Sequence, residues 1–193
     1  LIDEFQDTDP TQYSIFRQIY AGSRLPVFLV GDPKQAIFGF RGADIFAYLA
    51  AGRDAEARRT LDRNWRSAPG LVQAVNAVFG RAEDPFVFDE ISFHPVRPAE
   101  KERQPLVVAG DDEAPLRIWC LTRAGEREPM SKEKASPAAI QATAAEVARL
   151  LAVAGREEAR IGETALKGGD IAVLVRTNAQ ADRVREALLA GTL

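Results

Sequence analysis

The sequence predicts an α/β fold in which helices alternate with the strands of a mainly parallel sheet. Apolar runs at residues 1–2, 27–30 and 171–175 indicate three of those strands. The first two pass directly into Asp3-Glu4 and Gly31-Asp32, as buried parallel strands do where they enter the loops of their carboxyl edge. Amphipathic stretches separate the runs, which is the pattern of a layered α/β domain.

The helices are indicated by their end signals and their apolar spacing. Asp9 is a typical N-cap, Pro10 suits the first helical position, Gln12 can complete a capping box, and Gly22 would end the helix. Its spaced apolar residues are expected to pack in the core: Tyr13, Phe16, Ile19 and Tyr20. Further helices are expected near 43–51, with Ile45, Phe46 and Leu49 inward, after an N-cap at Ser67, from Ser136-Pro137, and over 179–190.

The remaining segments are predicted as short strands and loops. Residues 58–67 begin as a short strand, and Leu116 to Leu121 alternates as a strand in which Trp119 and Cys120 have structural roles. Loops are expected over most of 81–115, over 122–135 and over the glycine-rich stretch 155–169.

Composition restricts the class of protein. The 193 residues are 46% apolar and 27% charged with a net charge of −3, which is ordinary for a globular protein. The single cysteine excludes an internal disulfide, and one histidine without a cysteine cluster argues against zinc. The absence of a membrane-length apolar run predicts a cytoplasmic protein without a membrane partner. Because the chain opens on Leu1 at the end of a strand, we expect a fragment of a longer polypeptide.

Two carboxylates, Asp3 and Glu4, follow the first apolar run. A parallel strand delivers such side chains to the crevice at its carboxyl end, where ligands of α/β sheets bind. There Asp3 would hold Mg²⁺, directly or through water, and Glu4 would act as general base for an attacking water molecule or would orient it. The alternative is a solvated acidic turn.

The loop from Val30 to Asp44 carries an unusual set of side chains. Gln35 can bond a phosphate oxygen, and Arg41 can clamp a backbone phosphate. Phe38 and Phe40 offer ring faces on which bases of single-stranded nucleic acid can stack. The loop therefore predicts a junction between a nucleotide site and nucleic acid, and a surface loop with inward aromatic rings is the alternative.

Trp65 and Arg66 lie just ahead of the helix capped by Ser67. Free N–H groups and the helix dipole favour an anion there, so Arg66 could act as an arginine finger in cis on a γ-phosphate. Trp65 could stack on a base. A core tryptophan beside a snorkelling arginine is the alternative.

Taken together, these stretches resemble the superfamily 1 helicases of the UvrD/Rep type, and among them the RecB-type helicase–nucleases, the exodeoxyribonuclease V beta-subunit family. Asp3 to Thr8 resembles helicase motif II, the Walker B site, and residues 31–44 are similar to motif III. Leu61 to Ser67 resembles motif IV, and Asp170 to Arg176 the strand region called IVa. The resemblance implies a RecA-like P-loop NTPase helicase fold, with the end of the first motor domain in 1–56 and part of the second in 57–193.

The resemblance also implies roles for individual residues. Asp3 would ligate Mg²⁺ and Glu4 would activate water, while Gln6 and Gln35 would sense the γ-phosphate of ATP. Single-stranded DNA would be contacted by Phe38, Phe40, Arg41 and Asn64. Trp65 would stack near the adenine, where many relatives carry tyrosine, and Arg66 would stabilise γ-phosphate charge. Because Gln35 and Phe40 share one loop, closure on ATP would move the DNA-stacking face.

The implied activity is that of an ATP-dependent DNA helicase subunit of a helicase–nuclease acting on single-stranded and duplex-end DNA in double-strand-break repair. Its partners would be the other subunits of that complex. The Gly-x-x-x-x-Gly-Lys-Ser/Thr phosphate loop, the later helicase motifs and the nuclease domain are missing from the sequence. We therefore expect no ATP hydrolysis by this chain alone. An AddA-type subunit and a non-enzymatic, helicase-like interaction module are the alternatives.

Overall fold

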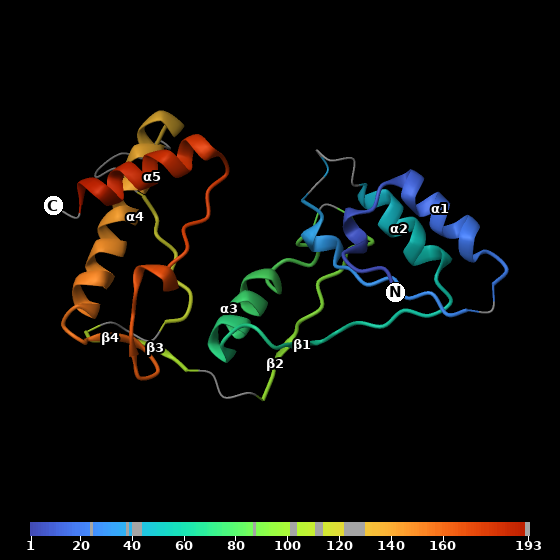
Figure 1. The fold of residues 1–193 in the computed structure, drawn as a ribbon, viewed down its shortest axis with the longest axis horizontal. Helices are drawn as coiled ribbons and strands as arrows, with labels where there is room; N and C mark the ends of the chain where they lie inside the picture. The colour runs from blue at the N-terminus through green and yellow to red at the C-terminus, as the bar shows by residue number, and fades with distance from the viewer. Residues whose placement is uncertain are drawn as a thin grey trace. The chain divides into compact units, whose positions relative to one another are not determined.

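The computed structural model describes residues 1–23, 25–37, 39, 44–86, 88–100, 104–110, 114–121 and 130–191. The chain divides into two compact units (Figure 1). The first comprises Leu1–Asn64 and Val75–Arg97, and the second comprises Trp65–Ala74 and Pro98–Leu193. The boundary between two motor domains at residue 56 is implied by the resemblance to the helicases, and it stays a prediction.

The first unit begins with two extended segments that pair in parallel. Ile2 and Leu29 form a parallel β-bridge. The Ile2 N–H donates to the Phe28 carbonyl, and the Val30 N–H donates to the Ile2 carbonyl, each at 2.8 Å. The Phe5 N–H then donates to the Val30 carbonyl at 2.9 Å. The predicted parallel relation between these two runs is therefore present, as a bridge rather than a long pair of strands.

Phe5 is the centre of the core of this unit, with 1% of its surface exposed. The ring of Tyr13 meets it edge-on at 5.7 Å between centroids, and the ring of Tyr48 lies at 6.2 Å. α2 (Ile45–Asp54) lies beside α1 (Pro10–Tyr20) and buries Ala47, Leu49 and Ala51 (Figure 1). The inward orientation predicted for Phe46 is wrong: this side chain is 59% exposed and meets the Phe88 ring edge-on.

α1 starts where the sequence predicted. The Asp9 carboxylate accepts from the Gln12 N–H at 2.8 Å, and the Gln12 side-chain oxygen accepts from the Asp9 N–H at 3.2 Å, which completes the capping box. The expected core packing is wrong for the last turn, where Ile19 is 62% and Tyr20 40% exposed. Helical spacing identifies a shared face, but burial needs a neighbouring element over its whole length.

α3 (Pro69–Phe79) begins later than the predicted N-cap. Because Pro69 is the first helical residue, position 68 and not Ser67 precedes the helix. Its end at Gly80 is as predicted, with the Gly80 N–H donating to the Asn76 carbonyl at 2.9 Å. Asn76 also bonds the end of the loop that follows α3. Its side chain donates to the Val96 carbonyl at 2.7 Å and accepts from the Val96 N–H at 3.3 Å.

One short strand precedes α3, and another follows the loop. β1 (Arg63–Asn64) pairs with β2 (Arg97–Pro98) in a two-stranded sheet. The Arg97 N–H donates to the Asp62 carbonyl at 2.7 Å, and the two side chains form an ion pair. The Phe79 ring stacks at 5.6 Å from both Phe86 and Phe93, which packs the loop against the end of α3.

The second unit combines two helices with a three-stranded antiparallel sheet. The strands are β3 (Leu106–Val108), β4 (Ala159–Ile161) and β5 (Thr164–Ala165), in the order β3-β4-β5. α5 (Asn178–Ala190) packs against α4 (Lys132–Ala154) (Figure 1). The core joins the end of α4 to the sheet through Val153, Ala154, Ala159 and Leu166.

Several predictions for this unit are corrected. The stretch 155–169, predicted as loop, contains the β4–β5 hairpin, whose turn uses Gly162 at φ +60°. α4 begins at Lys132 rather than at Ser136, so Pro137 lies inside the helix. The predicted strands at 116–121 and 171–175 belong to no strand in the structure, and Leu174 is 95% exposed. Trp119, 52% exposed, and exposed Cys120 have no core role.

The described residues form a mixed α/β structure, so the α/β class predicted from the sequence is confirmed. A mainly parallel sheet is not formed within them, because their strand pairs of known direction are antiparallel apart from the Ile2–Leu29 bridge. Among the helices in the described ranges, none has the length and apolarity needed to cross a membrane.

Candidate functional site

The two predicted carboxylates lie at the end of the parallel pairing. Asp3 and Glu4 are both exposed, and the Asp3 carboxylate accepts from the Glu4 N–H at 2.9 Å. Glu4 has φ 50° and ψ 40°, the left-handed conformation that non-glycine residues rarely adopt. A strained backbone of this kind costs of order 1–3 kcal/mol, so the surrounding contacts must hold it.

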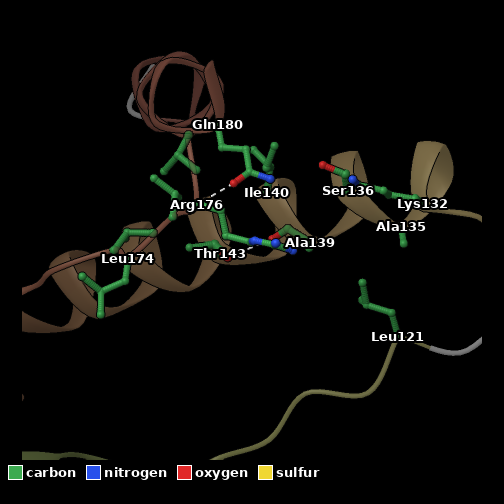
Figure 2. A pocket seen from close by; sticks show the side chains of 13 residues that line it. Leu121, Lys132, Ala135, Ser136, Ala139, Ile140, Thr143, Leu174, Arg176 and Gln180 are labelled. Carbon is green, nitrogen blue, oxygen red and sulfur yellow. Dashed lines mark hydrogen bonds between the residues drawn. The ribbon is translucent and has the colours of Figure 1, made fainter. Parts of the chain in front are cut away.

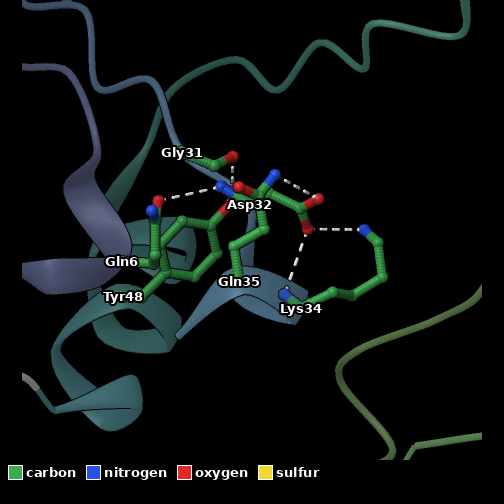
Figure 3. A network of polar contacts seen from close by, with 6 residues as sticks. All are labelled: Gln6, Gly31, Asp32, Lys34, Gln35 and Tyr48. Atoms are coloured by element: carbon green, nitrogen blue, oxygen red, sulfur yellow. Dashed lines mark hydrogen bonds and ion pairs between the residues drawn. The ribbon is translucent and has the colours of Figure 1, made fainter. Parts of the chain in front are cut away.

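One of those contacts comes from Gln6, which is 2% exposed. Its side-chain nitrogen donates to the Glu4 carboxylate at 2.7 Å, and its side-chain oxygen accepts from the Asp32 N–H at 3.0 Å. Figure 3 shows the Gln6 amide directed at the backbone of Asp32. The Gln6 side chain thus connects the segment with the acidic pair to the start of the second predicted motif.

Because Gly31 has no side chain, the Gln6 amide can lie close to the backbone of residues 31 and 32. A Cβ at position 31 would lie 2.6 Å from the Gln6 side-chain oxygen and 3.1 Å from the backbone nitrogens of Phe5 and Gln6. A side chain at this position would therefore force the Gln6 side-chain oxygen to move and would press on the neighbouring backbone. Tyr48 fixes the same residue from α2, because its hydroxyl donates to the Gly31 carbonyl at 3.2 Å (Figure 3).

Asp32 organises the turn that carries Gln35. Its carboxylate accepts from the Lys34 N–H at 3.0 Å and pairs with the Lys34 ammonium at 2.6 Å. It also accepts from the Gln35 side-chain nitrogen at 3.2 Å, so the 3₁₀ turn Pro33–Gln35 is capped at its start. Burial alone would raise the pKa of Asp32, but the hydrogen bonds from Lys34 and Gln35 outweigh it and lower that pKa.

The structure brings some predicted site residues together. Glu4, Gln6 and Gln35 are connected through Asp32, and Asp3 is joined to Glu4. Gly31, Asp32 and Tyr48 also belong to this network, and the sequence did not predict their positions in it. An N-cap aspartate before a proline was a readable signal for Asp32, whereas nothing in the sequence pointed to Tyr48.

The remaining predicted site residues belong to other parts of the chain. Asn64 lies in β1 of the first unit, while Trp65, 62% exposed, and exposed Arg66 belong to the second unit. Phe38, Phe40 and Arg41 lie outside the described residues. Their roles stay predictions.

The acidic pair is the metal site that the sequence predicts. Within the described ranges, no group of three or more His, Cys, Asp or Glu side chains could hold an ion by itself. Carboxylate oxygens are nonetheless the ligands that Mg²⁺ prefers, and Mg²⁺ commonly binds through one or two carboxylates plus phosphate oxygens and water. The exposed side chains of Asp3 and Glu4 fit such a partial site.

A pocket of about 430 Å³ lies in the second unit, between α4, α5 and residues 173–176 (Figure 2). Its lining is mostly apolar, with Leu121, Ile140 and Leu174 among the contributors. Arg176 is held at its edge by its N–H, which donates to the Gln180 side chain at 2.9 Å. The pocket contains no carboxylate, so it is not the site that the acidic pair predicts.

Comparison with known proteins identifies the class. Residues 1–56 match the family described as the UvrD/REP helicase N-terminal domain. These residues include Asp3, Glu4, Gln6 and Gln35, the connected part of the site. The resemblance to the UvrD/Rep-type helicases is thus confirmed.

The chain is homologous to RecB. Over 97% of its length it is 42% identical to the RecBCD enzyme subunit RecB of Escherichia coli K12 and 37% identical to that of Haemophilus influenzae. A stretch of 78 residues, 40% of the chain, is 50% identical to RecB of Mycobacterium tuberculosis. The chain spans 16%, 15% and 7% of the lengths of these three relatives.

Proposed function

We propose that this chain is part of the ATP-driven DNA motor of a RecB-type helicase–nuclease subunit. The observation that carries the proposal is the connection between the acidic pair and the Gln35 turn: Gln6 bonds both Glu4 and the Asp32 backbone. A motor needs the group that activates water and the group that reports on the γ-phosphate to move together. The homology to RecB supports the RecB type over the AddA type.

Within this proposal, Asp3 and Glu4 act at the phosphates of ATP. Asp3 would ligate Mg²⁺, and Glu4 would accept a proton from the attacking water molecule. When bound, Mg²⁺ would neutralise charge on the phosphates. The exposed side chain of Gln35 bonds the Asp32 carboxylate, and it can turn toward a ligand when that contact is released. Arg66 would stabilise γ-phosphate charge, and Trp65 would stack near the adenine.

DNA contact is proposed for the remaining site residues. Phe38 and Phe40 would stack on bases, while Arg41 and Asn64 would contact the backbone of single-stranded DNA. Because Phe40 follows the Gln35 turn by five residues, a movement of that turn would displace the stacking surface. Duplex DNA ends and the other subunits of a helicase–nuclease complex are the proposed partners.

The test is ATP hydrolysis by the full-length protein that contains this chain, with and without single-stranded DNA. Glu4→Gln should abolish turnover, because the amide cannot accept the proton from water. Phe40→Ala should weaken the stimulation by DNA and spare basal turnover. Glu56→Gln, at an exposed position outside the site, is the matched control for the loss of a carboxylate and should behave as wild type.

Two results would count against the proposal. Absence of DNA-stimulated turnover in the full-length protein with its partner subunits would favour the helicase-like interaction module. Turnover retained by Glu4→Gln would remove the acidic pair from the chemistry, even if the protein hydrolysed ATP.

A further inference from the structure

The environment of Gln6 differs from that of a ligand sensor. Its side chain is 2% exposed, and both ends of its amide already have protein partners: the Glu4 carboxylate at 2.7 Å and the Asp32 N–H at 3.0 Å. To reach a phosphate, Gln6 would have to break both bonds and leave the N–H of half-buried Asp32 without its partner. The loss of such a partner is unfavourable, which disfavours a direct phosphate contact by Gln6.

The chemistry of the two partners determines how the amide is oriented. A carboxylate only accepts, so the nitrogen of Gln6 must face Glu4. A backbone N–H only donates, so the oxygen of Gln6 must face Asp32. No other side chain of this length offers one donor and one acceptor: glutamate lacks the donor, and methionine has neither in useful strength.

We propose that Gln6 is a positioning residue that couples the carboxylate of Glu4 to the turn carrying Gln35. Its nitrogen fixes one oxygen of Glu4, which leaves the other for the attacking water molecule. Its oxygen fixes the backbone of Asp32, whose carboxylate in turn holds Lys34 and Gln35. This inference rests on the proposed function and deepens it, and it replaces the γ-phosphate contact expected for Gln6.

The connection between Glu4 and Gln35 is buried at Gln6 and exposed at Gln35. Gln6 is buried and Gly31 packs against it at a distance that excludes a Cβ. The Asp32–Gln35 contact is exposed and longer, at 3.2 Å. The Gln35 N–H also donates to the Asp32 carbonyl at 2.9 Å, so the two residues stay joined through the backbone of the turn when the side-chain contact is released. A ligand that draws Gln35 away would therefore shift Asp32, and that shift would reach Glu4 through Gln6.

The experiment compares Gln6→Met with wild type in the full-length protein, with ATP and single-stranded DNA. Loss of positioning predicts a fall in kcat of about ten- to a hundredfold, with the KM for ATP changed less than about twofold. A direct phosphate contact instead predicts a raised KM and weaker discrimination between ATP and ADP, and that result would overturn the proposal. Gln18→Met, on the exposed face of α1, is the matched control.

Two further variants separate positioning from folding. Gly31→Ala leaves Gln6 in place but forces its oxygen away, so it should reproduce the fall in kcat; it decides the question if Gln6→Met does not fold. The effect of Gln35→Ala on kcat should shrink at least threefold in the Gln6→Met background, because the two residues act along one connection. Additive effects would contradict the coupling.

The proposed function and this inference fail in different ways. If the wild-type protein shows no turnover, or if Glu4→Gln retains it, the proposed function fails and the inference fails with it. If Glu4→Gln abolishes turnover while Gln6→Met and Gly31→Ala keep the wild-type kcat, only the inference is overturned.

Discussion

At the scale of single residues, Tyr13 connects α1 to α2. Its hydroxyl donates to the Asp54 carboxylate at 2.7 Å, and the Arg17 side chain pairs with the same carboxylate at 3.5 Å. Burial, the hydrogen bond to Asp54 and the negative charge of Asp54 raise the pKa of Tyr13 from 10.0 to about 12, against a smaller lowering by Arg17. We predict that Tyr13→Phe removes the last step of the phenolate absorbance titration.

The hydrogen bond between Tyr13 and Asp54 should make the free energy of unfolding depend on pH. Between pH 10 and about 12 the folded chain keeps a proton on Tyr13 that the unfolded chain has lost, so the free energy of unfolding should fall as the pH rises through this range. Below pH 10 the contribution is fully present. Asp54→Asn should lower the pKa of Tyr13 and weaken this fall, and an unchanged titration in either variant would contradict the assignment.

The site residues differ in how far the sequence revealed them. Asp3, Glu4 and Gln35 were predicted because their positions after apolar runs, together with their chemistry, are local properties. The burial of Gln6 and the role of Gly31 depend on two segments separated by 25 residues in the chain meeting at a distance of hydrogen-bond length. No local pattern contains that information, so the sequence alone does not predict the hydrogen bonds of Gln6 to Glu4 and Asp32.

At the scale of elements, the capping box of α1 gives a direct stability prediction. Asp9→Ala removes the acceptor for the Gln12 N–H and should lower the free energy of unfolding by about 1 kcal/mol. Asp9→Ser keeps a side-chain acceptor and should restore most of that loss. Urea unfolding of the two variants beside wild type measures both effects, and equal losses would show that the cap does not determine the stability of α1.

Elements with local signals were predicted better than those without them. α1 and α5 each follow a residue whose side chain caps the helix, Asp9 and Thr177 respectively. The bounds of both helices lie within a residue or two of the predicted bounds. Residues 116–121 and 171–175 have the apolar patterns of strands, but a strand also needs a hydrogen-bonded neighbour, and none of the described strands pairs with them. Pro137 suggested a helix start because proline is favoured there, whereas α4 extends five residues before it.

At the scale of the whole molecule, charge gives no sign of the proposed DNA partner. The net charge is −3, so a general attraction to phosphate is not expected. DNA contact in this proposal depends on a few side chains of residues 38–64, within a stretch, 34–66, that holds seven Lys and Arg against four Asp and Glu. The sequence motifs and the homology to RecB, rather than bulk composition, therefore indicate the class.

The distribution of site residues also predicts what this chain does by itself. It contains the acidic pair and the Gln35 turn, but its sequence has no Gly-x-x-x-x-Gly-Lys-Ser/Thr loop to hold the β- and γ-phosphates. Without that loop, ATP has no fixed position relative to Glu4, and the proximity that accelerates the reaction is lost. We predict that the 193-residue chain hydrolyses ATP at the background rate, with or without single-stranded DNA.

Steady-state phosphate release from the purified chain, compared with its Glu4→Gln variant, measures this. Equal and near-background rates are expected for both. Turnover well above background that disappears in Glu4→Gln would mean that residues of this chain position the phosphates by themselves. The nucleotide site would then have to be sought around the Gln6–Asp32 connection, and the dependence on a phosphate loop would be wrong.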